Sequence, residues 1–361
     1  MTTRPVPTDL LPWALASLSE GSQAEASPQT DSSLKIVAGD ASNRRYFRLN
    51  AGDSSYIVAE APPATEKNEA FVAVRNILAQ AGVRVPQIHA VDLGRGYLLL
   101  EDLSDCSLLP ELSGETVDGY YQQVIALLEK MAAIDIGNWP DDFYDLALLR
   151  EELGRFTTWF VEPLLGYSLD DKERDLVQRF NTALIGSALE QPRVLVHRDF
   201  HSRNLMLQPS GKLAVIDFQD AVAGPVTYDL VSLLRDCYIR WPAGRVQGWA
   251  LAYYAKMQGK GALHGVDETQ FLRWFDWMGL QRHIKVLGTF ARLHLRDGKP
   301  GYLDDLPVVI SYVEEILEKY AREVPVFAEF QSWFNERLSP LIIGQNWMGN
   351  SRARHEGEAS A

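Results

Sequence analysis

The segment "VLVHRDFHSRNLMLQPSGKLAVIDFQD", from Val194 to Asp220, sets acidic and amide side chains between apolar runs. Its runs "RVLVH" and "LAVIDF" are typical of β-strands, and "LMLQPSGK" predicts a further strand and a turn between them. The pattern His197-x-Asp199-x4-Asn204, and Asp217 thirteen residues beyond the asparagine, therefore fall at strand ends or in loops. Loops held by a rigid scaffold are where proteins usually display their chemistry.

Phosphoryl transfer from a nucleotide accounts for three of these residues. A carboxylate must orient the attacking hydroxyl, the role predicted for Asp199, while an amide and a second carboxylate hold Mg²⁺, the roles predicted for Asn204 and Asp217. Because Mg²⁺ prefers oxygen ligands, this set favours a magnesium-dependent kinase over a zinc hydrolase. The competing interpretation is a group of Asx turns that cap neighbouring elements, and the flanking strands make catalysis the preferred hypothesis.

Composition limits the class of protein. A chain of 361 residues is longer than one hydrophobic core usually serves, so two lobes are expected. Its 35 basic and 48 acidic residues give a formal charge of -13, which argues against binding to nucleic acid or an anionic membrane. Cys106 and Cys237 have neither metal-ligand nor disulfide-framework spacing. With no signal peptide in residues 1–10 and no apolar run near ~20 residues, a soluble cytoplasmic protein is predicted.

The chain changes character near Asp105. Before it, strands are predicted within residues 34–50 and 54–63, a helix over Lys67–Ala81 closed by Gly82, and two strands around Gly94–Gly96. After it, long amphipathic helices dominate. A short helix is also predicted at 10–18. The helices predicted after Asp105 are Val117–Ile134, Leu146–Leu165, Asp170–Leu189, Tyr228–Arg240, Arg245–Gln258, Glu268–Leu295 and Leu306–Tyr320. The expected division is a β-rich N-lobe (1–102), a helical C-lobe (103–345) and a flexible tail (346–361).

The motifs "HRDFHSRN", "VIDFQDA" and "YDL" resemble the catalytic segment of the aminoglycoside phosphotransferase family, and the likeness extends from about Leu34 to Tyr320. The resemblance implies an α+β, two-lobed, protein-kinase-like fold that binds ATP in the cleft between the lobes. Asp229 matches the family's buried aspartate, which braces the catalytic loop. His197 is interpreted as a buried structural histidine and not as a base.

The same resemblance implies contacts with the nucleotide. "GDASNRRYFRL" matches the phosphate-covering hairpin, in which Gly39, Ser42 and Asn43 offer backbone N–H groups to phosphate oxygens. "LLLEDLSD" matches the linker between lobes, so the backbone from Glu101 to Leu103 is expected to face the adenine.

One position departs from the pattern. The strand after the phosphate hairpin usually carries a lysine, and here Glu60 lies near the expected place. Arg44, Arg45 and Lys67 are left as candidates for the missing positive charge.

The acceptor site is predicted from polar residues near the catalytic segment. His201 and Arg203 flank the catalytic residues and are expected to contact the sugar or a phosphate, with Arg203 preferred for phosphate. Asp236 and Arg292 stand among aromatic residues and are expected to line the acceptor pocket. For each single residue, helix packing with an exposed charge is the alternative.

Finer motifs, "GVRVPQI", "GYLLLEDL" and "LQRHIKVLGTFARLHLRDGKPGYLDDLP", resemble one branch of the family, the anomeric amino-sugar kinases of peptidoglycan recycling. That likeness implies ATP- and Mg²⁺-dependent transfer to the C1 hydroxyl of N-acetylmuramate and N-acetylglucosamine, giving the α-1-phosphate. No nucleic acid, membrane or obligate protein partner is expected. A kinase of aminoglycosides, choline or amino alcohols is the alternative; a pseudokinase is disfavoured, because Asp199 and Asp217 are both present.

Overall fold

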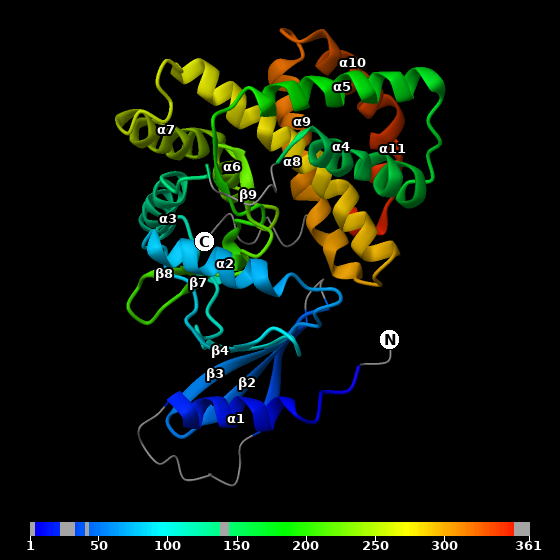
Figure 1. The fold of residues 1–361 in the computed structure, drawn as a ribbon. Coiled ribbons are helices and arrows are strands. Elements are labelled where there is room, and N and C mark those ends of the chain that lie inside the picture. Colours follow the sequence, from blue (N-terminus) through cyan, green and yellow to red (C-terminus); the bar gives the residue numbers. More distant parts are fainter. Residues whose placement is uncertain (1–3, 22–32, 40–42, 138–143, 350–361) are drawn as a thin grey trace. The chain divides into compact units, whose positions relative to one another are not determined.

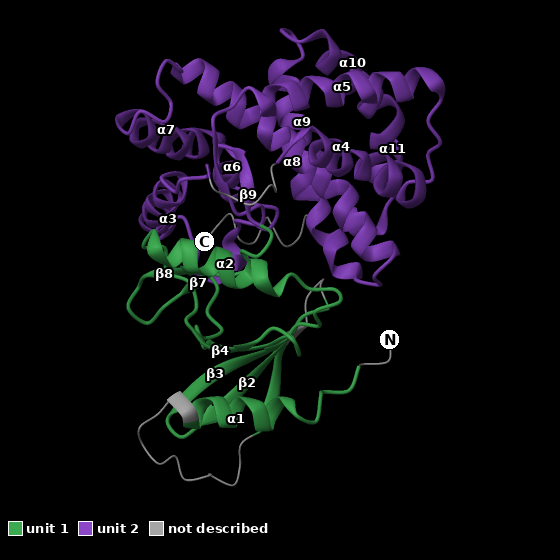
Figure 2. Cartoon of the chain, in the orientation of Figure 1, with its two compact units in different colours: residues 1–107, 205–220 green, residues 108–204, 221–361 purple. Residues whose placement is uncertain are grey.

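The structure is a computed structural model that describes residues 4–21, 33–39, 43–137 and 144–349. By their contacts, the residues form two compact units, coloured separately in Figure 2. Unit 1 comprises Met1–Ser107 and Leu205–Asp220, and unit 2 comprises Leu108–Asn204 and Ala221–Ala361. Ser42 lies outside the described residues.

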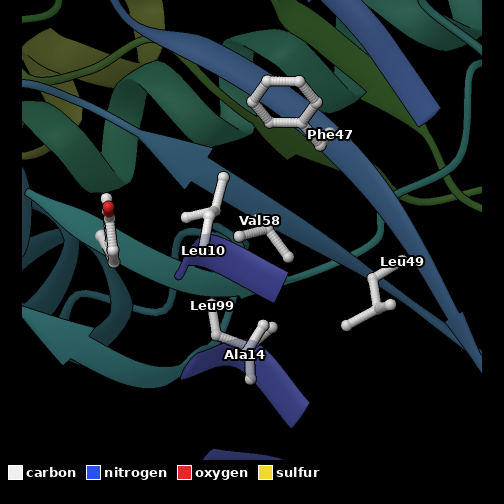
Figure 3. Packing of buried hydrophobic residues seen from close by; sticks show 7 residues of the cluster. Leu10, Ala14, Phe47, Leu49, Val58 and Leu99 are labelled. Atoms are coloured by element: carbon white, nitrogen blue, oxygen red, sulfur yellow. The ribbon is translucent and has the colours of Figure 1, made fainter. Parts of the chain in front are cut away.

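A five-stranded antiparallel sheet, ordered β1-β2-β3-β5-β4, forms the centre of unit 1 (Figure 1). In β2, Phe47 and Leu49 are buried while the residues between and after them are more exposed, which is the alternation of a sheet with one face on a core. Helix α1 (Leu10–Gly21) packs its Leu10 and Ala14 against this face, as Figure 3 shows. The strands are β1 (Leu34–Gly39), β2 (Arg45–Ala51), β3 (Ser54–Glu60), β4 (Ile88–Asp92) and β5 (Tyr97–Glu101).

Two glycines of unit 1, Gly82 and Gly96, adopt the left-handed backbone conformation at turns. Helix α2 (Asn68–Gln80) is followed by Gly82, whose φ of 73° is the left-handed conformation found after a helix C-terminus, so the predicted role of this glycine is confirmed. Gly96 has φ 72°, and a Cβ there would lie 1.9 Å from the carbonyl oxygen of Ala61. Only glycine fits a turn that approaches another backbone so closely.

A hairpin formed by β7 (Leu205–Leu207) and β8 (Leu213–Val215) belongs to unit 1. Met206 and Ala214 pack on Leu103. The N–H of Leu207 donates to the oxygen of Cys106 at 2.8 Å, and that of Val215 to Arg84 at 2.8 Å. The sequence predicts these strands, and their hydrogen bonds and apolar contacts join them to unit 1.

Helix α8 (Glu268–Leu295) is the central element of unit 2 and is buried along most of its length. Figure 1 shows it beside α4, α5 and α9. Gly288 permits a close approach, because a Cβ there would lie 2.3 Å from the backbone of Arg155. The other helices of unit 2 are η1 (Leu109–Glu111), α3 (Val117–Ala132), α4 (Leu146–Arg155), the π-helix η2 (Phe156–Leu164), α5 (Asp171–Leu189), η3 (Ser202–Asn204), α6 (Tyr228–Leu234), α7 (Ala243–Gly259), η4 (Pro300–Asp305), α9 (Leu306–Tyr320), α10 (Pro325–Trp333), the π-helix η5 (Phe334–Leu338) and α11 (Ser339–Ile343).

The expected α+β class is confirmed, and several helices match their predicted bounds, α8 and α9 at both ends. Helix α6 is shorter than predicted, since it ends at Leu234 and not at Arg240. Of the predicted tail, 350–361 lie outside the described residues, whereas Trp347 is buried. Within the described ranges, each helix is too short or too polar to cross a lipid bilayer.

Candidate active site

The loop that carries Asp199 and Asn204 lies in unit 2, directly after β6 (Arg193–Val196), which pairs with β9 (Val222–Pro225). The Asn204 side chain donates through Nδ2 to the carbonyl oxygen of Asp199 at 2.9 Å, and the His201 N–H donates to the same oxygen at 3.1 Å. These bonds fold the loop on itself. The Asp199 side chain is exposed on the outside of this turn.

Asp229, the second residue of α6, holds the start of this loop. Its carboxylate accepts hydrogen bonds from the backbone N–H groups of His197 at 2.6 Å and Arg198 at 3.1 Å. Arg198 has φ 77°, an uncommon conformation outside glycine, so the paired N–H groups stabilise a strained bend just before Asp199. Burial raises the pKa of Asp229 to about 6, although the charge of His197 and the two N–H groups act against this rise.

A buried ionic group, here called the Glu152 cluster, consists of Glu152, Arg198 and Lys285. The fully buried carboxylate of Glu152 contacts Arg198 Nη2 at 2.8 Å and Lys285 Nζ at 3.2 Å, and it accepts a short hydrogen bond from the Tyr144 hydroxyl. Lys285 also donates to the hydroxyl of Tyr228 at 3.0 Å. The cluster thus places two cations against one carboxylate, beside the loop that bears Asp199.

The positive charges of the Glu152 cluster lower the pKa of two carboxyl groups, Glu152 and Asp199. Burial pushes the pKa of Glu152 up, but Lys285 and Arg198 outweigh it and hold the pKa below its ordinary value. Asp199 behaves alike: desolvation by the surrounding protein acts to raise its pKa, and the positive charges of Lys285 and Arg198 lower it overall. Asp199 is therefore a carboxylate at neutral pH.

Asp217 lies in unit 1, just after β8, with φ 63°. Gln219 donates through Nε2 to Asp217 Oδ1 at 2.8 Å. The next residue, Phe218, is fully buried and lies against Phe71 of α2 with ring centroids 4.8 Å apart. The backbone at Asp217 is therefore in the left-handed conformation, next to a buried aromatic side chain.

Two of the residues predicted for the acceptor site, His201 and Arg203, lie against the ring of Tyr238. The guanidinium of Arg203 lies 3.5 Å from the centre of the Tyr238 ring, and the imidazole of His201 meets the ring edge-on at 5.3 Å. The Arg203 side chain is 46% exposed and 4.0 Å from Asp305. Burial lowers the pKa of His201, so its ring is neutral at pH 7. Both side chains are thus oriented by one aromatic ring.

The other two acceptor candidates have different surroundings. Asp236 is buried, and it accepts hydrogen bonds from the N–H and hydroxyl of Ser202, at 2.9 and 2.5 Å, and from the N–H of Tyr238 at 3.3 Å. These contacts fasten Asp236 to the loop that carries Asp199 and Asn204. Arg292 lies near the end of α8, where burial and the charge of Arg155 lower its pKa. Contact of either residue with a sugar stays a prediction.

The residues predicted for the nucleotide lie in unit 1. Gly39 ends β1 and pairs with Arg45, and the N–H of Asn43 donates to Glu66 at 3.0 Å. Glu101 and Leu103, which were predicted to belong to the linker, form hydrogen bonds within unit 1. The Glu101 carboxylate is bound by Arg84 and by the N–H of Gln87, and the oxygen of Leu103 accepts from Gln208 at 3.1 Å. Their contact with adenine stays a prediction.

A family model described as "Phosphotransferase enzyme family" matches residues 33–268, from β1 to the start of α8. This chain belongs to the phosphotransferase enzyme family. The matched range contains Asp199, Asn204, Asp217 and Asp229.

Named relatives of this phosphotransferase agree in their descriptions. It is 44% identical to an N-acetylmuramate/N-acetylglucosamine kinase of Pseudomonas putida, over 79% of this chain and 84% of the relative. It is 38% identical to a protein of the same description in Neisseria meningitidis serogroup B, over 83% and 90% of the two chains.

A solved structure shows the same architecture. Aminoglycoside phosphotransferase APH(2'')-Ib, in its ADP-bound form, matches with a TM-score of 0.53 and 14% identity, over 84% of this phosphotransferase and 98% of that chain. The predicted protein-kinase-like α+β fold is thereby confirmed.

The donor atoms predicted to hold magnesium in this phosphotransferase fit that ion. The hydrogen bond from Asn204 Nδ2 to Asp199 fixes the amide plane and turns Oδ1 away from that carbonyl, while Asp217 supplies a carboxylate. Both offer the hard oxygen atoms that Mg²⁺ prefers. In the described part of the chain, no group of three or more His, Cys, Asp or Glu side chains is arranged to hold a metal.

The sequence pattern does not reveal three residues around the loop of this phosphotransferase: Glu152, Lys285 and Tyr238. Lys285 had a detectable signal, because it shares a helical spacing with Gln281 and lies within the long apolar pattern of α8. Glu152 stands in the charged run "LREELGR", where its neighbour Glu151 has the same chemistry and a different environment. Its burial depends on tertiary contacts alone.

Proposed function

We propose that this chain is an ATP-dependent N-acetylmuramate/N-acetylglucosamine kinase, a phosphotransferase with an alcohol group as acceptor. The observation that carries the proposal is an exposed Asp199 carboxylate on a braced loop, in a chain 38–44% identical to kinases of that description over most of its length. We further propose that transfer is to the anomeric C1 hydroxyl, giving the α-1-phosphate for peptidoglycan recycling.

In this proposal Asp199 orients the acceptor hydroxyl and takes its proton. The lowered pKa of Asp199 makes it a weak base. A hemiacetal hydroxyl at C1 is more acidic than an ordinary alcohol, so a weak base suits the anomeric position better than C3 or C6.

Asn204 and Asp217 would hold Mg²⁺ on the nucleotide. When bound, the ion neutralises the charge that develops on the phosphate oxygens during transfer. The Asn204 side chain also ties the loop to the backbone of Asp199, so one residue serves both the ion and the base.

Arg203 is the proposed partner for an anionic group of the substrates. N-acetylmuramate carries a lactyl carboxylate, and Arg203 offers an exposed guanidinium whose plane is set by Tyr238. His201, neutral and against the same ring, can hydrogen-bond a sugar hydroxyl. A cationic acceptor such as choline would be repelled by this guanidinium, which already covers the face of Tyr238.

We place the reaction in the cytoplasm. Cys106 and Cys237 are thiols and form no disulfide, which suits a reducing compartment where ATP is available.

A substrate screen tests the proposal. Release of ADP is measured with N-acetylmuramate, N-acetylglucosamine, choline and kanamycin, and the product is examined by phosphorus NMR with coupling to the anomeric proton. Turnover with both amino sugars and a C1 phosphate is expected. Turnover with choline or kanamycin alone would overturn the assignment, and a phosphate at C3 or C6 would overturn the anomeric step while leaving the sugar as substrate.

A further inference from the structure

The strand β3 of unit 1 ends in Glu60, where kinase-type sheets usually carry a cation for the nucleotide phosphates. Three cations near the first hairpin are candidates for this role: Arg44, Arg45 and Lys67. Their environments within unit 1 distinguish them.

Arg45 is occupied by Glu60. Its Nε lies 2.5 Å from Glu60 Oε2, and Arg4 Nη2 contacts the same oxygen at 2.6 Å. Arg45 also donates to the backbone oxygens of Arg4 and Pro5. This arginine therefore fastens the N-terminal segment to the sheet.

Lys67 is a surface residue. Its side chain is 62% exposed, and its ammonium contacts Asp220, also exposed, at 3.3 Å. A flexible ammonium in water has no fixed direction, so it is a poor element of a phosphate site.

Arg44 is held from several sides. It is 2% exposed, and its guanidinium lies 4.8 Å from the centre of the Phe71 ring. Nη2 donates to Asn68 Oδ1 at 3.3 Å, and Nε lies 3.8 Å from Glu66 Oε2. Glu66 also accepts the N–H of Asn43, so one carboxylate fixes both the hairpin end and the arginine. The pair at 3.8 Å is an ion pair without a short hydrogen bond, which a phosphate of higher charge can outcompete.

Arg44 and Asp217 converge within unit 1. Phe71, on which Arg44 stacks, contacts Phe218, the residue after Asp217. The charges of Arg44 and Asp217 both act on the hydroxyl of Tyr46. Burial raises the pKa of Tyr46, the charge of Arg44 lowers it and the charge of Asp217 raises it. The guanidinium and the proposed metal ligand therefore have neighbours in common within unit 1.

We propose that Arg44 is the phosphate-binding cation of the nucleotide in this chain, with Glu66 as its carboxylate partner and Phe71 as the surface that orients it. The inference rests on the proposed function, since it needs a nucleotide. A guanidinium offers parallel N–H groups that match two phosphate oxygens, which a lysine cannot do. The phosphate hairpin and its cation are then adjacent in the chain, as Asn43 and Arg44.

Paired binding measurements test the role of Arg44. The dissociation constants of ADP and adenosine are determined by calorimetry at fixed Mg²⁺ for the wild type, Arg44→Met and the matched control Arg45→Met. For Arg44→Met, a roughly 10- to 100-fold loss of ADP affinity is expected with unchanged adenosine affinity. For Arg45→Met, the ratio of the two constants is expected to equal that of the wild type.

Arg44→Lys is the second variant, because removal of a buried arginine can unfold the sheet. It keeps the charge and loses the paired N–H groups, so a smaller loss is expected, confined to ADP. Equal losses for ADP and adenosine, or an unchanged ADP affinity in either folded Arg44 variant, would show that Arg44 only supports the fold. Since no sugar is present, the result is independent of the substrate screen. Failure of that screen would leave this result standing.

Discussion

Asp199 acquires its properties from residues far away in the sequence. Asp229 of α6 holds the backbone before it, Glu152 of α4 holds the neighbouring Arg198, and Lys285 of α8 adds positive charge. The local pattern around Asp199 predicts a catalytic loop, and the resemblance to the phosphotransferase family implies the bracing aspartate, Asp229. The pattern could not reveal the Glu152 cluster, because burial of a single glutamate in a charged run is decided by packing and not by periodicity.

Replacing Asp199 by Asn is expected to lower kcat by about 10²- to 10⁴-fold, because the amide cannot accept the hydroxyl proton. Nucleotide affinity is expected to stay unchanged, as Asn keeps the shape of the side chain. ADP release under saturating sugar and calorimetric ADP binding provide the two measurements. Asp220→Asn, at an exposed carboxylate paired with Lys67, is the control and is expected to behave as the wild type. Normal turnover in Asp199→Asn would exclude it as the base.

The pKa of Asp229, about 6, predicts an acid limb in the activity. Above this pH the carboxylate is ionised and accepts strongly from His197 and Arg198; below it the proton weakens both bonds and the loop loosens. Its pKa is raised above the unfolded value, so protonation favours the folded state. Between pH 6 and 4, this group therefore adds stability while activity falls.

The pH dependence of kcat, with circular dichroism at each pH, separates these two effects. Asp229→Asn is expected to be less active at all pH values and to lack a limb near pH 6. A limb that persists in this variant would assign the titration to the nucleotide or to another side chain.

Glu152→Gln is expected to destabilise the protein by about 3–5 kcal/mol, because Arg198 and Lys285 would be left buried without a compensating charge. The neighbouring Glu151 is an exposed partner of Arg155 one turn away, so Glu151→Gln is expected to change the free energy of unfolding by about 0–1 kcal/mol. Urea unfolding of both variants measures the difference. Equal effects would mean that burial of the Glu152 cluster is unimportant.

At the scale of elements, the starts of α4 and α8, where an aspartate side chain caps the helix, were predicted correctly, whereas the end of α6 was not. The buried residues of α9 follow the 3.6-residue period to its end, whereas α8 is buried on all sides over its middle. α6 stops at Leu234, and two residues later the Asp236 carboxylate binds Ser202 and the N–H of Tyr238. Apolar residues continue after Leu234 in the sequence. The pattern therefore does not reveal a turn that depends on the distant Ser202.

Because Gly288 of α8 lies against the backbone of Arg155, one added methyl group at Gly288 is expected to change the stability of the protein. Gly288→Ala would place a Cβ against this backbone and is expected to lower the free energy of unfolding by about 1–3 kcal/mol. Gly186→Ala in α5 meets no atom within 4 Å and is expected to raise it by about 0.5–1 kcal/mol. Thermal unfolding of both variants checks the opposite signs. A stabilised Gly288→Ala would contradict the close packing described here.

At the scale of the whole molecule, the residues proposed for catalysis are shared between the two units. Asp199 and Asn204 belong to unit 2, and Asp217 belongs to unit 1. The chain passes from one unit to the other after Ser107, after Asn204 and after Asp220. The sequence predicts a β-rich part and a helical part. It does not predict that one later hairpin belongs to the first unit, because the segments "LML" and "LAV" are typical of any buried strand.

This return also has a consequence for the newly made protein. Unit 1 is complete only when its second segment, Leu205–Asp220, has left the ribosome. The helices of unit 2 from η1 to α5 are synthesised in between. At about 5–20 residues per second, the wait between residues 107 and 205 lasts roughly 5 to 20 s. During this interval Leu103 lacks its partners Met206 and Ala214, so the unit that is started first waits with an unfinished apolar edge that chaperones can bind.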